Sequence, residues 1–119
     1  KHLPSPWFCV YPDLGNLTAW GSDVAAELSA GIHHIVGVHV KESRPVGPGF
    51  AGAFRDVPFG EGSVDFEAIV KKLAGYGYEG WFVVEAEQDP KKAPPLKMAQ
   101  IGHKELMRVM TAAGYTVVA

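Results

Sequence analysis

The chain repeats one arrangement three times: a short apolar run, then a loop, then a stretch with helical spacing. The apolar runs are residues 7–12, 34–40 and 81–86. Each is too short for a helix and rich in β-branched or aromatic residues, which predicts a strand. Near-continuous apolar strands that alternate with amphipathic helices are typical of a parallel sheet covered by helices. The fold class is therefore α/β with parallel strands.

Helix signals follow each run. Ser22 is a candidate N-cap for a helix over 22–31, which Gly31 would end. A second helix is expected within 63–77, with Ser63 and Asp65 as cap and first-turn acid. A third is expected near 97–113, closed by Gly114. The stretch between the first run and the first helix is expected to be a loop.

Length and composition limit the function classes. A chain of 119 residues makes a single domain. Its net charge of −2 predicts no nucleic-acid partner and no anionic membrane surface. No apolar run approaches the roughly 20 residues of a membrane span. The single cysteine, Cys9, lies in an apolar run, which predicts a buried free thiol in a reducing cytoplasm.

The carboxyl ends of the three predicted strands carry polar residues of matching kinds. Asp13 follows the first run, His39 lies in the second and Glu85 ends the third. Ligands gather at this end of parallel α/β sheets. One nitrogen and two carboxylates suit Mn²⁺, Mg²⁺, Co²⁺ or Zn²⁺. The sequence therefore predicts a divalent metal site.

Structural roles compete with this interpretation for each residue taken alone. An aspartate after a strand is commonly a turn or cap residue, and a histidine in an apolar run is commonly a hydrogen-bonded core residue. Glu85 is harder to explain in this way, because burying a carboxylate without a partner costs several kcal/mol. The spacing by itself leaves both interpretations open.

Three motifs go beyond spacing: "YPDLGNL" at 11–17, "HVKE" at 39–42 and "FRDVPFGEG" at 54–62. With their surroundings, over about residues 5–85, they resemble the L-xylulose-5-phosphate (L-ribulose-5-phosphate) 3-epimerase and hexulose-6-phosphate isomerase-like family. That family belongs to the xylose isomerase-like TIM barrels. The resemblance implies that the chain is the C-terminal part, about strands six to eight, of a (β/α)8 barrel. A single partial barrel domain over 1–119, from a longer chain, is expected.

The resemblance also implies a function and a set of site residues. It places Asp13, His39 and Glu85 as metal ligands, with Glu85 also catalytic, and the fourth ligand of the family, a glutamate from an earlier strand, has no counterpart here. It implies a ketose 3-epimerase or isomerase that acts on a sugar or sugar phosphate through an enediolate. Arg55 falls where the family uses an arginine to hold substrate. Lys41 and Glu61 are further candidates for substrate binding, and Glu61 could instead orient His39.

Alternatives accompany each of these roles. Arg55 could form a surface salt bridge with Asp56 or Glu61, Lys41 could be a solvated strand end, and Glu61 could serve only a turn. The segment "VVEAEQDPKKAPPL" at 83–96 resembles inosose dehydratase, a different enzyme on the same fold. The chain could also be an inactive fragment that self-associates, since open sheet edges need covering. A homo-oligomer is expected.

Overall fold

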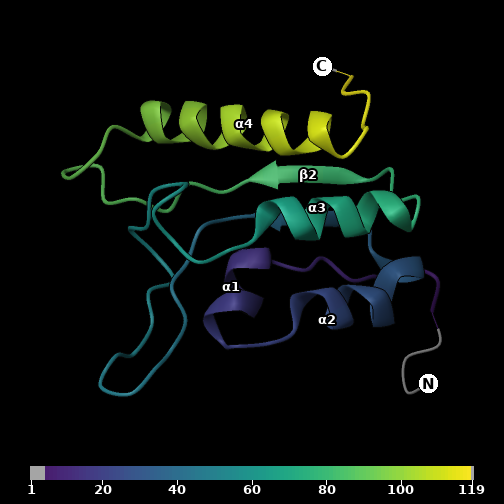
Figure 1. Ribbon diagram of the computed structural model, residues 1–119, viewed down its shortest axis with the longest axis horizontal. Coiled ribbons are helices and arrows are strands. Elements are labelled where there is room, and N and C mark those ends of the chain that lie inside the picture. The colour runs from purple at the N-terminus through teal and green to yellow at the C-terminus, as the bar shows by residue number, and fades with distance from the viewer. Residues whose placement is uncertain (1–4, 119) are drawn as a thin grey trace.

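A computed structural model of the chain describes residues 5–118. Two parallel strands lie at its centre, β1 (Gly37–Val40) and β2 (Trp81–Val84), and His39 pairs with Val83. The helices are α1 (Leu14–Ala19), α2 (Val24–Gly31), α3 (Phe66–Gly75) and α4 (Pro95–Ala112), and a 3-10 turn, Ile32–His34, leads into β1. Figure 1 shows α3 and α4 beside the strands and α1 and α2 on the other side of α3. The predicted α/β class with parallel strands is confirmed.

The core lies between the helices and one face of the sheet. Val38 and Val40 of β1 point into it, as do Phe82 and Val84 of β2. Successive side chains of a strand point to opposite faces, so Trp81 and Val83 lie on the other face, where Trp81 is 78% exposed. The predicted helical stripes are buried, and their residues are Val24, Leu28, Phe66, Ile69, Val70 and Leu73.

The first predicted strand does not form a regular ladder. The bridge between Val10 and Ile35 and the bridge between Asp13 and His39 nevertheless place it parallel to β1. Pro12 lacks the N–H that would continue the ladder. The register also slips by one residue, because three steps of the first run, 10 to 13, match four steps of the second, 35 to 39.

Helix boundaries differ from the prediction in ways that side-chain caps explain. The predicted loop after the first run contains α1, which begins because the Asp13 carboxylate accepts a hydrogen bond from the N–H of Asn16. Asp23, not Ser22, caps α2, and Asp65, not Ser63, caps α3. The last helix begins two residues early, with Pro95 in its first turn, where proline is favoured.

Cys9 is exposed, so the prediction of a buried thiol was wrong. It lies in the segment before Val10, whose side chains are exposed as well, including Trp7 at 91%. Within residues 5–118, no helix is long and apolar enough to cross a membrane.

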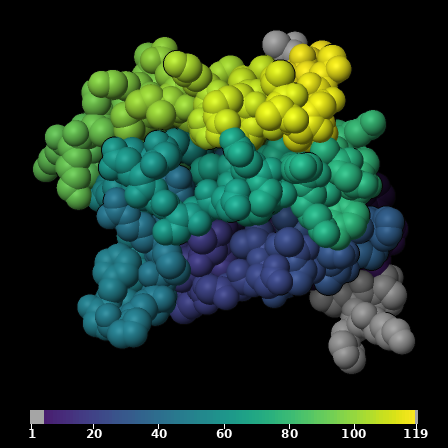
Figure 2. Space-filling model, viewed as in Figure 1, coloured from purple at the N-terminus to yellow at the C-terminus, as the bar shows by residue number. Residues whose placement is uncertain are grey.

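The loops after β1 and β2 extend from the same end of the sheet. In Figure 1 both leave on the left, beyond the arrowhead of β2. Figure 2 shows the same loops as two lobes, blue-teal below and green above, standing out from the helical body. This end is the carboxyl end of the strands, where the sequence predicts the site.

Candidate metal centre

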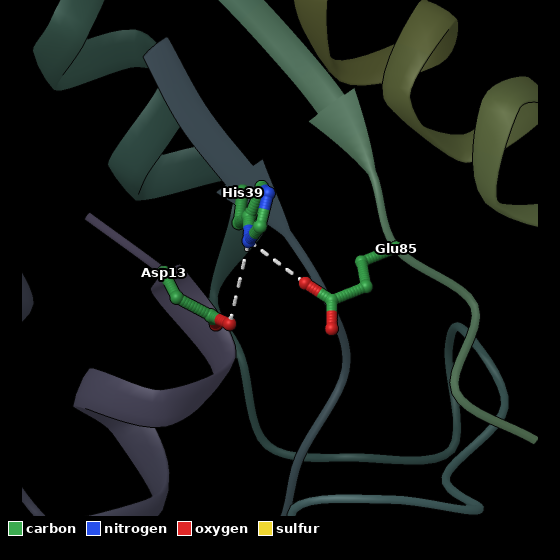
Figure 3. Close-up of side chains that lie close together, drawn as sticks. All are labelled: Asp13, His39 and Glu85. Carbon is green, nitrogen blue, oxygen red and sulfur yellow. Dashed lines mark ion pairs between the residues drawn. The ribbon is translucent and has the colours of Figure 1, made fainter. Parts of the chain in front are cut away.

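Three side chains from three different segments converge at the carboxyl end of the sheet. Asp13 ends the first segment and caps α1, His39 lies in β1, and Glu85 follows β2 directly. The N–H of Glu85 donates to the carbonyl of Val40, so the pairing of β1 and β2 continues one residue past β2. Figure 3 shows the three side chains pointing into one space between the segments that carry them.

The distances fit a small cation. His39 Nδ1 lies 2.8 Å from Glu85 Oε2 and 3.9 Å from Asp13 Oδ2. One ligand atom from each residue lies within 4.8 Å of the other two, and all three residues are half-buried. A divalent ion with bonds of about 2.0–2.2 Å to nitrogen and oxygen holds its ligand atoms roughly 3–4 Å apart. The donors therefore suit such an ion with little movement.

The His39 ring packs against the ring of Tyr11. The two ring centroids are 4.3 Å apart in an edge-to-face arrangement. Gly37 makes room for this contact, because a Cβ there would lie 2.7 Å from the Tyr11 ring. This packing limits the orientations that the imidazole can adopt.

Asp13 has two structural tasks, one for each oxygen. Its Oδ1 accepts the capping hydrogen bond from Asn16, at 2.8 Å, and its Oδ2 faces His39 and Lys41. The cap fixes the carboxylate in one orientation, with the second oxygen left for the cluster. The two interpretations that the sequence left open for Asp13 are thus compatible in the structure.

Lys41 belongs to the same cluster and is buried. Its Nζ lies 3.2 Å from Asp13 Oδ2, 3.5 Å from Glu85 Oε1 and 2.8 Å from Glu87 Oε2. Lys41 is therefore not a solvated strand end. Three carboxylates surround one ammonium, which leaves an excess of two negative charges before the exposed Arg55 is counted. A divalent cation would balance that excess.

The electrostatics of this cluster show in two pKa values. Burial alone would lower the pKa of Lys41, but the hydrogen bond to Glu87 and the charges of Asp13 and Glu85 raise it above its usual value. The hydrogen bond from Lys41 lowers the pKa of Glu87, against the effect of desolvation, and the charges of Lys41 and Arg55 act in the same direction. Both groups are therefore charged at neutral pH.

Arg55 lies at the edge of the cluster. Its side chain is 77% exposed, and its Nε lies 3.5 Å from Glu87 Oε1. Among the described residues its ion-pair partner is Glu87, rather than the Asp56 or Glu61 that the sequence offered as a surface salt bridge.

Glu61 is not brought to the cluster. It is exposed, its carbonyl accepts hydrogen bonds from Arg44, and its carboxylate has no contact with His39 within residues 5–118. The buried glutamate of this region is Glu42, which the sequence analysis did not single out. Its carboxylate accepts hydrogen bonds from the N–H groups of Ser43, Gly60 and Val64.

Glu87 is the other residue that the sequence analysis missed. It lies two residues after Glu85, and side chains two apart along an extended chain share a face. That spacing was the available signal, since Lys41 lies two residues after His39 in the same way. In the structure, Lys41 and Glu87 form an ion pair with each other.

Comparisons with known proteins agree with this geometry. The family model described as "Xylose isomerase-like TIM barrel" matches residues 1–109. The chain belongs to this family. The resemblance inferred from the three motifs is confirmed at this level.

The curated relatives and solved structures point the same way. SgbU of Escherichia coli (strain K12) is 52% identical over 98 residues, which cover 82% of this chain and 34% of that protein. The L-ribulose-5-phosphate 3-epimerase UlaE of Escherichia coli O139:H28 is 46% identical over 99 residues, 83% of this chain and 33% of that protein. The chain thus spans about a third of the length of the curated relatives it matches.

A structure of L-ribulose 3-epimerase superposes with a TM-score of 0.68 at 18% identity, covering 88% of this chain and 37% of that one. A D-tagatose 3-epimerase-like protein gives 0.67 at 19% identity, covering 94% of this chain and 39% of that one. At these identities the two structures show the fold, and they confirm that the chain corresponds to part of a TIM barrel.

Proposed function

We propose that this chain forms part of a divalent-metal-dependent 3-epimerase that acts on a ketose or a ketose phosphate. The observation that carries the proposal is the convergence of Asp13, His39 and Glu85 at the carboxyl end of the sheet. Relatives named as 3-epimerases support the reaction class. A cytoplasmic location and a homo-oligomer remain predictions.

Asp13, His39 and Glu85 would hold the cation. When bound, it would supply Lewis acidity at the ketose carbonyl and stabilise the negative charge of the enediolate. Mn²⁺, Zn²⁺, Co²⁺ and Mg²⁺ all accept this donor set. Tyr11 would keep the imidazole of His39 oriented toward the ion.

Glu85 would move the proton. Its carboxylate lies in the cluster, with Oε2 toward His39 and Oε1 toward Lys41. Inversion at carbon 3 requires one group to remove the proton and another, on the opposite face, to return it. Glu85 would be one of the two, and the resemblance assigns the second to a glutamate of an earlier strand.

Lys41 would act by its charge and its position. Its ammonium is held between Asp13, Glu85 and Glu87, where it offsets part of their negative charge. A buried cation next to the carbonyl would also favour negative charge on the substrate oxygens. Arg55, at the rim, would bind oxygens of the sugar or of a phosphate with the two-pronged geometry of its guanidinium.

Two alternatives remain from the sequence. Inosose dehydratase would use the same proton abstraction followed by loss of water, but the relatives reported above are epimerases. An inactive, self-associating fragment would keep the fold without turnover. The first alternative predicts loss of water from the substrate instead of epimerisation, and the second predicts no reaction.

The test combines metal content with turnover. The purified chain is incubated with Mn²⁺, desalted and analysed for metal, beside His39→Ala and the control His103→Ala, which changes an exposed histidine of α4. We expect near-stoichiometric metal in the wild type and the control, and loss in His39→Ala. Conversion of L-ribulose 5-phosphate to its 3-epimer, with uptake of solvent deuterium at carbon 3, would then support the proposal. Absence of metal, or release of water from inosose instead, would overturn it.

A further inference from the structure

The loop after β1 and the segment after β2 are joined at a strained residue. Asp56 has a φ of 57°, and it is the non-glycine residue with a positive φ within residues 5–118. This conformation costs free energy for a residue with a Cβ, although aspartate tolerates it better than most. Such strain persists only where surrounding contacts hold the residue.

The contacts at Asp56 form what we call the clasp, made of Asp56, Val57, Gln88, Asp89 and Lys92. The carboxylate of Asp56 accepts from the N–H of Asp89 at 2.6 Å and from Lys92 Nζ at 2.8 Å. Gln88 Nε2 donates to the carbonyl of Val57 at 3.1 Å. All of these bonds cross from the loop after β1 to the segment after β2.

The clasp leads directly to the carboxylate cluster. The N–H of Asp56 donates to the carbonyl of Glu87 at 3.1 Å, so the backbones of 56 and 87 lie side by side. Arg55 is the preceding residue, and its Nε lies 3.5 Å from Glu87 Oε1. The other oxygen of Glu87 accepts from Lys41, which in turn contacts Asp13 and Glu85. An unbroken series of contacts therefore runs from the clasp to the metal ligands.

The negative charge of Asp56 strengthens the hydrogen bonds of the clasp. The hydrogen bond from Lys92 and the one from the N–H of Asp89 lower the pKa of Asp56, so its carboxylate is ionised at neutral pH. Hydrogen bonds to an ionised acceptor are shorter and stronger than neutral ones. Arg55 lacks any such restraint of its own: among the described residues its guanidinium has only the ion pair with Glu87.

We propose that Asp56 is a positioning residue, which holds Arg55 against Glu87 at the rim of the candidate metal centre by docking the loop after β1 onto the segment after β2. As a substrate-positioning device, this rests on the function proposed above. An exposed arginine side chain samples many rotamers, and binding a substrate would otherwise have to freeze them. Fixing its backbone and its Nε leaves the two terminal nitrogens for substrate oxygens.

Two replacements at position 56 separate positioning from backbone strain. Asp56→Gly adopts a positive φ without cost but has no carboxylate. Asp56→Asn tolerates the same φ and keeps an oxygen for the N–H of Asp89, while it loses the charge that pairs with Lys92. If Asp56 matters only for its backbone conformation, the glycine variant should equal the wild type. If the clasp matters, glycine should fail and asparagine should rescue part of the effect.

Lys92→Ala and Lys91→Ala form a matched pair of neighbours. Lys92 contacts Asp56, whereas the side chain of Lys91 makes no ion pair or side-chain hydrogen bond within residues 5–118. We expect a small effect for Lys92→Ala, because exposed ion pairs contribute little on their own. Lys91→Ala should behave as the wild type.

The experiment reads Arg55 directly, by NMR of its side-chain Nε–H in the purified 119-residue chain, assigned with Arg55→Lys. In the wild type we expect a signal displaced from that of free arginine, because the carboxylate of Glu87 lies beside Nε. In Asp56→Gly the signal should move to the position of free arginine, with a partial return in Asp56→Asn. An unchanged Arg55 signal in Asp56→Gly would overturn the proposal.

Ligand binding provides the second reading and separates the two proposals. In calorimetry with L-ribulose 5-phosphate and Mn²⁺, Asp56→Gly should raise the Kd of the sugar phosphate on the order of tenfold, since a misplaced binding group weakens substrate binding first. An unchanged Kd in Asp56→Gly would contradict a positioning role through Arg55. If the wild type binds neither Mn²⁺ nor the sugar phosphate while its Arg55 signal is present and is lost in Asp56→Gly, the proposed metal site fails and the clasp stands.

Discussion

The buried carboxylate of Glu42 offers a sharp test of how the loop after β1 is held. Glu42 is 3% exposed. Its Oε1 accepts from the N–H groups of Ser43, at 3.2 Å, and Val64, at 3.1 Å, and its Oε2 accepts from that of Gly60, at 3.1 Å. The side chain therefore ties the end of the loop, at 60–64, to its beginning.

The expected cost of Glu42→Ala follows from these bonds. The substitution removes the acceptor of three N–H groups, two of them buried. A buried donor that loses its partner costs about 1–3 kcal/mol, so the free energy of unfolding should fall by about 3 kcal/mol. Domains of this size are stable by about 5–15 kcal/mol. The variant should remain folded but be clearly weakened.

Urea unfolding measures this loss. With a slope of about 1–3 kcal/mol per molar urea, a loss of about 3 kcal/mol lowers the midpoint by one molar or more. Glu42→Gln keeps the shape and one oxygen but turns an NH₂ toward a backbone N–H, so we expect an intermediate loss. Glu61→Ala is the matched control, because its exposed side chain lies in the same loop, and it should change stability by less than about 0.5 kcal/mol.

Gly62 extends the test to a double-mutant cycle. A Cβ at position 62 would lie 2.2 Å from Glu42 Oε1, so Gly62→Ala should be destabilising in the wild type. In the Glu42→Ala background that obstacle is gone, and the two losses should not add. Additive losses in the double variant would refute the reasoning. So would a free energy of unfolding for Glu42→Ala within about 0.5 kcal/mol of that for Glu61→Ala, the range expected of surface substitutions.

Two further predictions concern charge. Lys41→Met removes the ammonium that lies 3.2 Å from Asp13 Oδ2. Because a nearby positive charge repels the ion, the variant should bind Mn²⁺ about tenfold more tightly, as measured by calorimetry. Weaker binding would mean that Lys41 mainly orients the ligands. Burial raises the pKa of Tyr78 to about 12, from 10 in the unfolded chain, so the folded phenol keeps its proton while the unfolded one loses it. Stability should then be complete below pH 10 and fall as the pH rises toward 12. In Tyr78→Phe the free energy of unfolding, measured by urea titration at several pH values, should fall less steeply over this range. An unchanged pH dependence would contradict the assignment to Tyr78.

Much of the fold could be predicted from local patterns. The strands at β1 and β2 and the helices α2, α3 and α4 follow from periodicity, which depends only on neighbours in the chain. The misplaced caps show the limit of that reasoning. Ser22 and Asp23 are both suitable N-caps, and the choice between them depends on where Val24 must lie to be buried.

The residue types of the candidate site could be predicted, but the contacts between its side chains could not. Asp13, His39 and Glu85 were found because parallel strands end at one edge of a sheet, and the structure brings them together. Glu42, Glu87 and the clasp were missed because they depend on contacts between residues 18 to 46 positions apart. No local pattern reports such distances.

The sequence by itself determined the α/β alternation, the polar strand ends and the family. Tertiary structure decided which side chains meet. A one-residue slip in register between the first segment and β1 pairs Asp13 with His39, whereas the unslipped register would have placed it beside Val38. Lys41 and Glu42 are neighbours in the sequence, yet Lys41 contacts the carboxylate cluster and Glu42 accepts hydrogen bonds from the loop after β1. The pleat sends successive side chains to opposite faces, and only the packing of the segments around them fixes what each face contains.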